Sequence, residues 1–495
     1  MIFLNNSKKI KKDKGSILLS VFIFSSLAVT VSLGFIGWAA SSLKVSKRLV
    51  YREQAFQIAE AGVDYYRWHL AHSSTDFTDG STTSSGPFTH IFYDKDGERI
   101  GYFELEITPP TTGSTLVIVK SSGHVDADPS VTRRIKTQLA IPSFAKFAVV
   151  ANADMRFGEG TVTYGPLHSN GGIRFDGIAY NLITSARSSY DDPDHDDTGS
   201  EKLEYGVHTH VRVPPLTGVS SAYLSSEVPP PTTPAERSDV FVAGREFPVP
   251  TVDFAGITSD LSAIKSSAQT DGQYYGASGG LGYLIVLKTD DTYDLYRVTN
   301  FSGASGCNNS QSQTGWGTWS VRSNGKTLLG NYALPSNGLI FLEDDVWVEG
   351  QIDGARLTIA AGRFPDTPST RKSITVNNDL LYTNYDGSDV IGLISQKDFN
   401  VGMVSDTNLR IDAALIAQNG RAGRYYYGSC TNSAKTSITL YGMIATNQRY
   451  GFAYTDGNGY DERVIIYDAN LLYAPPPSFP LTSDKYQTIG WEEVE

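Results

Sequence analysis

The sequence contains very little cysteine and little positive charge for its length. Only two cysteines, Cys307 and Cys430, occur among 495 residues, which is too few for a disulfide scaffold, and their separation excludes the C-x-x-C spacing of a zinc site. One disulfide between them is the pairing we expect if the chain is exported. The net charge of -12 opposes binding to nucleic acid, which normally needs a basic surface. We therefore expect no nucleic-acid partner.

A long stretch without charge follows a basic N-terminus. Residues 16–43 carry no charged side chain, and five lysines against one aspartate precede them. The stretch is long enough to cross a bilayer, and basic residues before it favour a cytoplasmic N-terminus. We expect a single-pass anchor in the cytoplasmic membrane that contacts lipid through these residues, with everything after Lys44 outside. A secretory signal cleaved at the small residues 39–42 is the alternative.

The helical pattern continues beyond the uncharged stretch. Apolar residues keep spacings of three, four or seven, so one helix is expected over residues 16–72, on the order of 80 Å long. Ala55, Ala59 and Gly62 form a stripe of small residues where the backbone of a neighbouring helix can approach. Gly62 costs about 1 kcal/mol inside a helix, which such a contact would offset. The alternative is that Gly62 packs against the chain's own β domain.

Two motifs resemble those of a known family. "KKDKG" followed by "SILLSVFIF" is similar to a prepilin leader, residues 1–15, which prepilin peptidase cuts after Gly15 to expose Ser16. "AEAG", which contains Glu60 and two residues of the small stripe, resembles a segment of the PilX-type minor pilins of type IV pili. We include Glu60 with the stripe as the expected helix-packing face. The resemblance implies a helix packed on a small sheet, with other pilins and the pilus assembly platform as partners.

One position departs from the pattern of major pilins. Ser20 stands at the fifth residue after the expected cleavage, where most major pilins have a glutamate that pairs with the terminal amine of the neighbouring subunit. In lacking this glutamate, the chain resembles several PilX-type subunits and the K component of the general secretion pathway. It implies a tip or initiating subunit rather than the bulk subunit.

The residues after the helix predict mostly β structure. Residues 73–141 alternate apolar and polar side chains between turn clusters, which indicates a small antiparallel sheet. Residues 142–338 are expected to form an irregular β-rich region with one helix at 257–268. Within that region, residues 187–245 are expected to make a long polar excursion.

Evenly spaced strands are expected over residues 339–474. Apolar doublets begin at residues 340, 357, 374, 391 and 409, in steps of 17, 17, 17 and 18. Such even steps favour stacked coils over a β-sandwich. Residues 475–495 are expected to form an extended, polyproline-like tail. The expected fold is therefore α+β and mainly β: a long N-terminal membrane helix, a small antiparallel sheet, and a right-handed parallel β-helix-like solenoid as the head.

The expected solenoid is also compatible with catalysis, because parallel β-helices host carbohydrate-active enzymes whose acids converge across coils. In the expected register, Asp345 and Asp379 share a row two coils apart, without a third acid or an arginine. "GASGG" around Ser278 matches a nucleophile elbow, but no histidine follows it in the chain and the strand-turn-helix context is missing. We assign no catalytic residue.

The acidic stretch 190–203 contains a partial calcium-binding pattern. Its aspartates alternate as oxygen ligands do in calcium loops, and a glutamate follows that can close the shell. These residues are Asp192, Asp194, Asp196 and Glu201. The sixth loop position is not glycine and the twelfth is not glutamate, so a solvated acidic loop is the alternative. His195, His208 and His210 offer a second, zinc-type candidate.

Together these features predict a minor pilin or a pilus assembly or tip subunit, without enzymatic activity. It would sit in the cytoplasmic membrane and then move into a pilus at the cell surface. Its β-rich head would be displayed for adhesion or subunit contact, with a surface glycan or a host cell as the expected partner, and no cofactor other than calcium. The alternatives are a membrane-anchored extracellular carbohydrate-active enzyme with a β-helix domain and a plain secreted protein.

Overall fold

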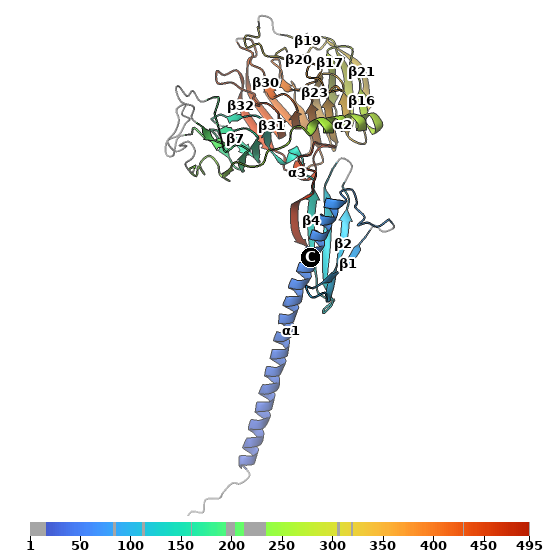
Figure 1. The fold of residues 1–495 in the computed structure, drawn as a ribbon, viewed down its shortest axis with the longest axis vertical. Coiled ribbons are helices and arrows are strands. Elements are labelled where there is room, and N and C mark those ends of the chain that lie inside the picture. The colour runs from blue at the N-terminus through green and yellow to red at the C-terminus, as the bar shows by residue number, and fades with distance from the viewer. Residues whose placement is uncertain are drawn as a thin grey trace, which may run out of the picture. The chain divides into compact units, whose positions relative to one another are not determined.

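The computed structural model describes residues 16–82, 86–110, 114–159, 161–194, 203–211, 234–303, 307–317, 320–428 and 430–494. The chain forms two compact units. Unit 1 comprises Met1–Thr108, Ile118–Thr137 and Gly490–Glu495, and unit 2 comprises Pro109–Val117 and Gln138–Ile489. The long N-terminal helix and the mainly β character that we predicted are confirmed (Figure 1).

Helix α1 spans Ser16–His72 and has two different halves. Every residue from 17 to 50 is exposed, including Phe24 at 71% and Trp38 at 70%. Beyond residue 50, one face is buried; Ile58 and Tyr66 are both 0% exposed. The first half therefore has no packing partner among the described residues, whereas the second half is part of a hydrophobic core.

That core is shared with a five-stranded sheet in the order β1-β2-β3-β4-β33. The strands are β1 Phe88–Tyr93, β2 Arg99–Thr108, β3 Val117–Val125, β4 Thr132–Ala140 and β33 Gln487–Val494. β1 and β3 both pair antiparallel with β2. Residues 475–495 were expected to be an extended tail, and this was wrong for their end: β33 joins the sheet beside β4, where Lys136 Nζ lies 2.7 Å from Glu492 Oε1.

The small-residue stripe of α1 packs on this sheet, which corrects the expectation that a neighbouring helix covers it. Ala55 and Ala59 are 0% exposed. A Cβ added at Gly62 would lie 2.9 Å from Phe103 Cδ2 and closer still to the Ser121 hydroxyl. A Cβ added at Gly123 of β3 would lie 2.6 Å from the Ala59 backbone nitrogen. Glycine thus occurs on both sides because helix and sheet backbones approach closely.

Unit 2 is built around parallel strand pairs. One ladder joins ten strands, each parallel to the next, in the order β15-β11-β8-β5-β31-β29-β27-β24-β22-β16. They are β15 Arg245–Glu246, β11 Ile183–Ser185, β8 Leu167–Ser169, β5 Val149–Ala151, β31 Ala434–Thr446, β29 Asn408–Ala417, β27 Val390–Ser395, β24 Arg356–Ala361, β22 Leu339–Leu342 and β16 Gln273–Tyr275.

Further parallel pairs run beside this ladder. β23 Val346–Ile352, β25 Ile374–Thr375, β28 Phe399–Val401 and β30 Ala422–Arg424 follow one another, and β26 Leu380–Tyr382 pairs with both β23 and β29. β31, β32 Gly459–Tyr467, β7 Val162–Tyr164 and β10 Ile178–Ala179 form another series. β17 Gly282–Leu287, β18 Thr292–Val298 and β21 Lys326–Ala333 are antiparallel neighbours, and β17 is parallel to β23.

Short elements complete unit 2. A small parallel sheet contains β6 Met155–Phe157, β9 Ile173–Phe175 and β14 Val207–His208. Two antiparallel pairs are β12 Ser189–Tyr190 with β13 Glu204–Tyr205, and β19 Phe301–Ser302 with β20 Ser320–Val321. The helices are η1 Phe144–Lys146, α2 Ile257–Asp271 and α3 Asn470–Tyr473. The predicted helix at 257–268 is thus present and one turn longer.

The middle strands of the ten-strand ladder are buried on both faces. Ile340, Leu393 and Leu415 belong to the large inner core, whereas their neighbours Phe341 and Ile394 belong to a second core that contains Leu261 and Ile264 of α2. Parallel strands covered on both faces are expected to be continuously apolar. This explains why the sequence shows apolar doublets rather than strict alternation.

The even steps of 17 residues do not describe the observed register. Leu357 pairs directly with Ile391, two expected steps later, whereas Ile374 lies in another series between Val346 and Phe399. The apolar doublets therefore come from different ladders, and the spacing alone does not reveal which ladder a strand joins.

Candidate functional site

The exposed half of α1 presents a long row of apolar side chains in the described part of unit 1. α1 is the one helix among the described residues that is long and apolar enough to cross a membrane, judged by length and composition. Gly34 and Gly37 have no atom within 4 Å of an added Cβ. Gly15 of the expected cleavage site lies outside the described residues, and Ser16 is the first residue of α1.

A basic groove follows this apolar surface within unit 1. It has a volume of about 440 Å³ and lies between α1 and the residues that connect β3 to β4, with Arg48, Arg52 and Arg133 on its walls. Glu60, expected to be a packing residue, is exposed on α1. A packing role for Glu60 therefore needs a partner outside the chain, unlike the buried stripe residues beside it.

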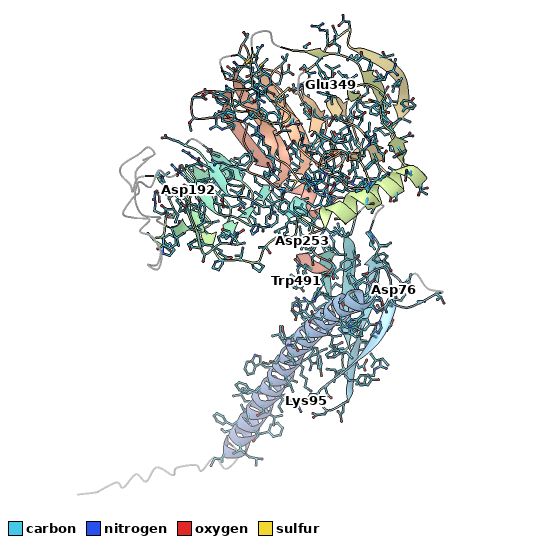
Figure 2. The ribbon with its side chains drawn as sticks, turned by 45° about the horizontal axis from the view of Figure 1, so that its top comes forward. Asp76, Lys95, Asp192, Asp253, Glu349 and Trp491 are labelled. Atoms are coloured by element: carbon cyan, nitrogen blue, oxygen red, sulfur yellow. A yellow bond between two sulfur atoms is a disulfide. The ribbon has the colours of Figure 1, made fainter. Side chains whose placement is uncertain are left out.

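A buried cluster of ligand-type side chains lies in unit 2. One ligand atom each of Asp192, His208 and His210 lies within 4.8 Å of the others, and all three residues are buried. His208 is the last residue of β14, and the register of β14 with β9 places it opposite Arg174. Figure 2 labels Asp192 among the strands at the start of unit 2. The chain thus joins one carboxylate and two imidazoles from segments on either side of residues 195–202.

Charged groups surround this cluster. Arg174 Nε donates to Asp176 Oδ2 over 2.7 Å, and Arg174 Nη1 lies 3.6 Å from Asp192 Oδ2. His208 Nε2 lies 3.4 Å from the same Asp192 oxygen. Burial alone would raise the pKa of Asp192, but the interactions with His208 and Arg174 hold it below its ordinary value. Asp192 is therefore ionised at neutral pH.

Of the four predicted calcium ligands, the structure describes Asp192 and Asp194. Asp194 does not turn toward Asp192: its carboxylate lies 2.5 Å from Arg449 Nη2 and 3.7 Å from Arg156 Nη1. An aspartate paired with two arginines is a poor calcium ligand, because the ion needs that negative charge itself. Asp196 and Glu201 lie outside the described residues, as does His195 of the zinc candidate. Sequence reasoning found His208 and His210 but missed their partnership with Asp192.

The acids considered for catalysis accept hydrogen bonds from backbone N–H groups instead. Asp345 Oδ1 accepts the Ser373 N–H over 2.8 Å, and Asp379 Oδ1 accepts the Arg410 N–H over 2.8 Å. The Ser278 hydroxyl donates to Asp344 Oδ2 over 2.7 Å. Asp345 and Asp379 each tie a turn to the next strand, which is the turn chemistry that their sequence context favoured.

The two cysteines are joined in the structure. Cys307 and Cys430 form a disulfide with a Cα–Cα distance of 5.2 Å, and no described cysteine is free. The bridge packs beside Met403 and Tyr427 in a small hydrophobic cluster. It fastens the segment after β19 to the strand region near β30.

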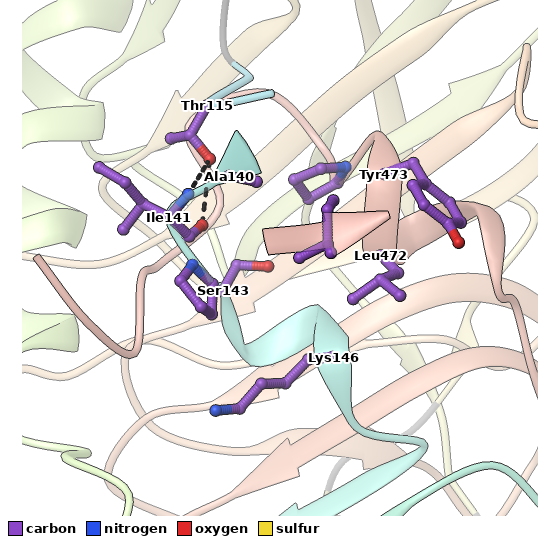
Figure 3. A pocket seen from close by; sticks show the side chains of 10 residues that line it. Thr115, Ala140, Ile141, Ser143, Lys146, Leu472 and Tyr473 are labelled. Atoms are coloured by element: carbon purple, nitrogen blue, oxygen red, sulfur yellow. Dashed lines mark hydrogen bonds between the residues drawn. The ribbon is translucent and has the colours of Figure 1, made fainter. Parts of the chain in front are cut away.

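Two cavities in the described part of unit 2 have walls that include polar groups already paired within the chain. Figure 3 shows one whose wall is braced by Thr115, which exchanges hydrogen bonds of 3.0 and 3.1 Å with the Ile141 backbone. At about 10 Å³ it holds no more than one water. A groove of about 510 Å³ is lined by Arg371 and Lys372. Both are already paired, with Asp366 and Asp344 respectively.

Comparisons with known proteins give a weak structural similarity. No family model matches the chain, and no curated protein matches it in sequence. Among solved structures, the chain is similar to the competence-associated pilin ComZ from Thermus thermophilus, with 14% identity, a TM-score of 0.29, and coverage of 90% of this chain and 98% of that one. At this identity and TM-score, function has to be argued from the residues themselves.

Proposed function

We propose that the chain is a minor pilin of the PilX type, a membrane-anchored subunit that joins a type IV pilus or a related filament. The observation that carries this proposal is the division of α1: residues 17–50 are exposed and mostly apolar, and the next half is packed on an antiparallel sheet. Such a surface needs either lipid or the helices of other subunits around it. A pilin uses both in turn, first in the membrane and then in the filament.

The leader-like N-terminus supports the same proposal. Cleavage after Gly15 would leave Ser16, at which α1 begins, as the first residue of the mature protein. Ser20 in place of the usual glutamate supports a tip or initiating position. Because the Ala55, Ala59 and Gly62 stripe is covered by the chain's own sheet, contacts with other pilins would use the exposed face of the helix instead.

Unit 2 is then the displayed head. We propose that its parallel ladders are the stacked coils of a β-helix-like solenoid, which supports contact with a surface or with other subunits outside the cell. Parallel neighbours such as β24, β27 and β29 support stacked coils because parallel strands require a crossover between them.

Mass spectrometry of the mature N-terminus tests the proposal. We expect the full chain to begin at Ser16 in cells with prepilin peptidase and at Met1 in cells without it. Gly15→Val should block cleavage and remove the chain from the sheared filament fraction. Gly158→Ala is the control, since Gly158 belongs to unit 2 and nothing lies within 4 Å of its added Cβ, and it should behave as wild type. A start near residue 42, or the same start in both strains, contradicts the proposal.

Crosslinking tests which face of the helix meets other subunits. Glu60→Cys places an accessible thiol on α1, and we expect it to crosslink to pilins in the filament fraction. Lys95→Cys, on the turn between β1 and β2 where the lysine side chain is 86% exposed, controls for accessibility alone. Equal crosslinking of both variants would contradict a specific helix contact.

A further inference from the structure

The proposed pilin function does not use the cluster of Asp192, His208 and His210. Its three side chains are buried at 3%, 0% and 1% exposure, so they are not a solvated acidic loop. We propose that they bind one zinc-type divalent cation, which fastens the segment after β12 to β14 and its extension. These side chains supply three of the four ligands of a tetrahedral zinc ion, and a water would be the fourth.

The spacing of two of the ligand atoms fits a metal better than a hydrogen bond. Zinc binds imidazole nitrogen and carboxylate oxygen at about 2.0–2.1 Å, so two ligands of a tetrahedron lie about 3.4 Å apart. Asp192 Oδ2 and His208 Nε2 are separated by 3.4 Å, beyond the usual hydrogen-bond range of about 2.7–3.2 Å. The largest separation in the cluster is at most 4.8 Å, so a side-chain movement of at most about 1.4 Å brings the third ligand into place.

The atoms that would not face the ion are held in position. His208 Nδ1 lies 3.3 Å from the Tyr190 hydroxyl, which leaves Nε2 pointing at the cluster. Asp192 Oδ1 accepts the Asp194 N–H over 3.0 Å, which leaves Oδ2 as the ligand oxygen. The His210 backbone N–H donates to Asp176 Oδ1 over 2.8 Å. Outer partners of this kind orient the ligands of metal sites.

The guanidinium of Arg174 leaves room for a metal at the cluster. Arg174 Nη1 approaches the same Asp192 oxygen at 3.6 Å, and a carboxylate oxygen has lone pairs for both a guanidinium and an ion.

The ligand set selects the class of metal. Two imidazoles and one carboxylate suit zinc and similar transition metals, whereas calcium prefers oxygen ligands alone. The competing explanation is a protonated His208 that forms an ion pair with Asp192 and needs no metal. The two explanations differ in what the purified protein carries and in which cations it takes up.

Metal analysis of the full chain in detergent tests the proposal. The protein is stripped with a chelator, incubated with Zn²⁺ or Ca²⁺, desalted and analysed for bound metal. We expect about one zinc per chain and no retained calcium. With Co²⁺ in place of Zn²⁺, we expect the visible absorption of a four-coordinate site.

Substitutions identify the ligands. His208→Gln and Asp192→Asn should each weaken zinc binding more than about tenfold and remove the Co²⁺ band. His168→Gln is the matched control: His168 is 2% exposed in the same unit, and its ring is bonded to Thr184 and Asn170 rather than to the cluster. It should bind zinc as wild type does.

Several outcomes would overturn the proposal. Wild-type protein that retains no zinc and shows no Co²⁺ band has an ion-pair cluster and not a metal site. Retention of calcium in place of zinc, or equal loss of zinc in His168→Gln, also refutes this assignment. If His208→Gln fails to fold by circular dichroism, the wild-type measurements and Asp192→Asn still decide the question.

Discussion

The close contact between α1 and β3 leads to a sharp prediction for Gly123→Ala. The backbone of Gly123 is not in the left-handed region, so alanine is conformationally acceptable there. However, its Cβ would lie 2.6 Å from the Ala59 backbone nitrogen and closer still to the Ala55 carbonyl. Ordinary contact begins near 3.4 Å, so the helix must move away by about 0.8 Å or more.

The expected loss follows from two opposing effects. Overfilling a packed interface costs about 1–3 kcal/mol, and the upper part of this range applies because the atoms in the way are backbone. Replacing glycine with alanine also restricts the unfolded chain, which recovers about 0.4–1 kcal/mol. The net loss is about 2 kcal/mol, or about a 30-fold change in the equilibrium between docked and undocked helix.

Hydrogen exchange of the full chain in detergent measures this equilibrium. Amides of β2 and β3 should exchange about 30-fold faster in Gly123→Ala than in wild type. Gly62→Ala should have a smaller effect, because its Cβ meets the side chains of Phe103 and Ser121 and alanine favours the helix by about 1 kcal/mol. Gly34→Ala should leave β2 and β3 unchanged. Wild-type exchange in Gly123→Ala, or equal effects of all three substitutions, would refute the packing argument.

Three further predictions concern other parts of the chain. Replacing Cys307 and Cys430 with serine opens a crosslink of 123 residues, which should remove up to about 5 kcal/mol and lower the urea midpoint of unit 2. Arg424→Met should lower the free energy of unfolding in urea by about 2–4 kcal/mol, since the buried guanidinium donates to three backbone carbonyls. Arg424→Lys should recover only part of this loss, because an ammonium lacks the planar set of donors that a guanidinium has. Hydrogen bonds, chiefly from the Thr78 N–H, lower the pKa of Asp76 from 3.8 to about 2. Its stabilisation of the turn after α1 is therefore complete above pH 3.8 and disappears as the pH falls through 2, and Asp76→Asn should abolish this acid dependence of Thr78 amide exchange.

The parts of the fold that could be predicted are those encoded by local patterns. The helix pattern and the absence of charge over residues 16–43 indicated α1, and alternation indicated the strands β1 to β4. The fifth strand could not be predicted in this way. β33 pairs with β4 across more than 300 residues of intervening chain, and its sequence "QTIGWEEV" follows a proline-rich stretch that resembles a tail. Pairing between strands that are far apart in the chain produces no local sequence pattern.

The small residues of α1 show a different difficulty. Ala55, Ala59 and Gly62 indicate that some backbone comes close, and this part was correct. The same stripe suits a partner helix or the chain's own sheet, because both present a backbone at short distance. Gly123 of β3 distinguishes a partner helix from the chain's own sheet, because it lies against the α1 backbone. No local sequence pattern connects Gly123 with α1.

The buried cluster was partly visible in the sequence. The alternating aspartates drew attention to the right segment, but Asp194 pairs with Arg449 from a distant turn, so alternation did not identify the ligands. His208 and His210 stand two residues apart and reach the cluster together with Asp192. A pattern based on calcium loops groups residues by spacing, whereas the fold groups them by strand pairing.

The chain path explains how a small sheet can carry a much larger unit. After β4 the chain enters the larger segment of unit 2, and β33 completes the sheet only when the chain leaves it. This segment, Gln138–Ile489, is therefore an insertion between two neighbouring strands. Its two ends lie together: the Phe144 N–H donates to the Pro480 carbonyl over 3.1 Å, and the Thr482 N–H donates to the Pro142 carbonyl over 2.8 Å.

The parallel ladder accounts for this closure. The chain runs outward from β5 through β8 and β11 to β15, restarts at the far end with β16, and returns strand by strand until β31 pairs with β5. The first and last strands of the ladder in chain order are therefore neighbours in its middle. Because the ends of the insertion meet, the sheet of unit 1 needs no change in its own strand order to hold the insertion.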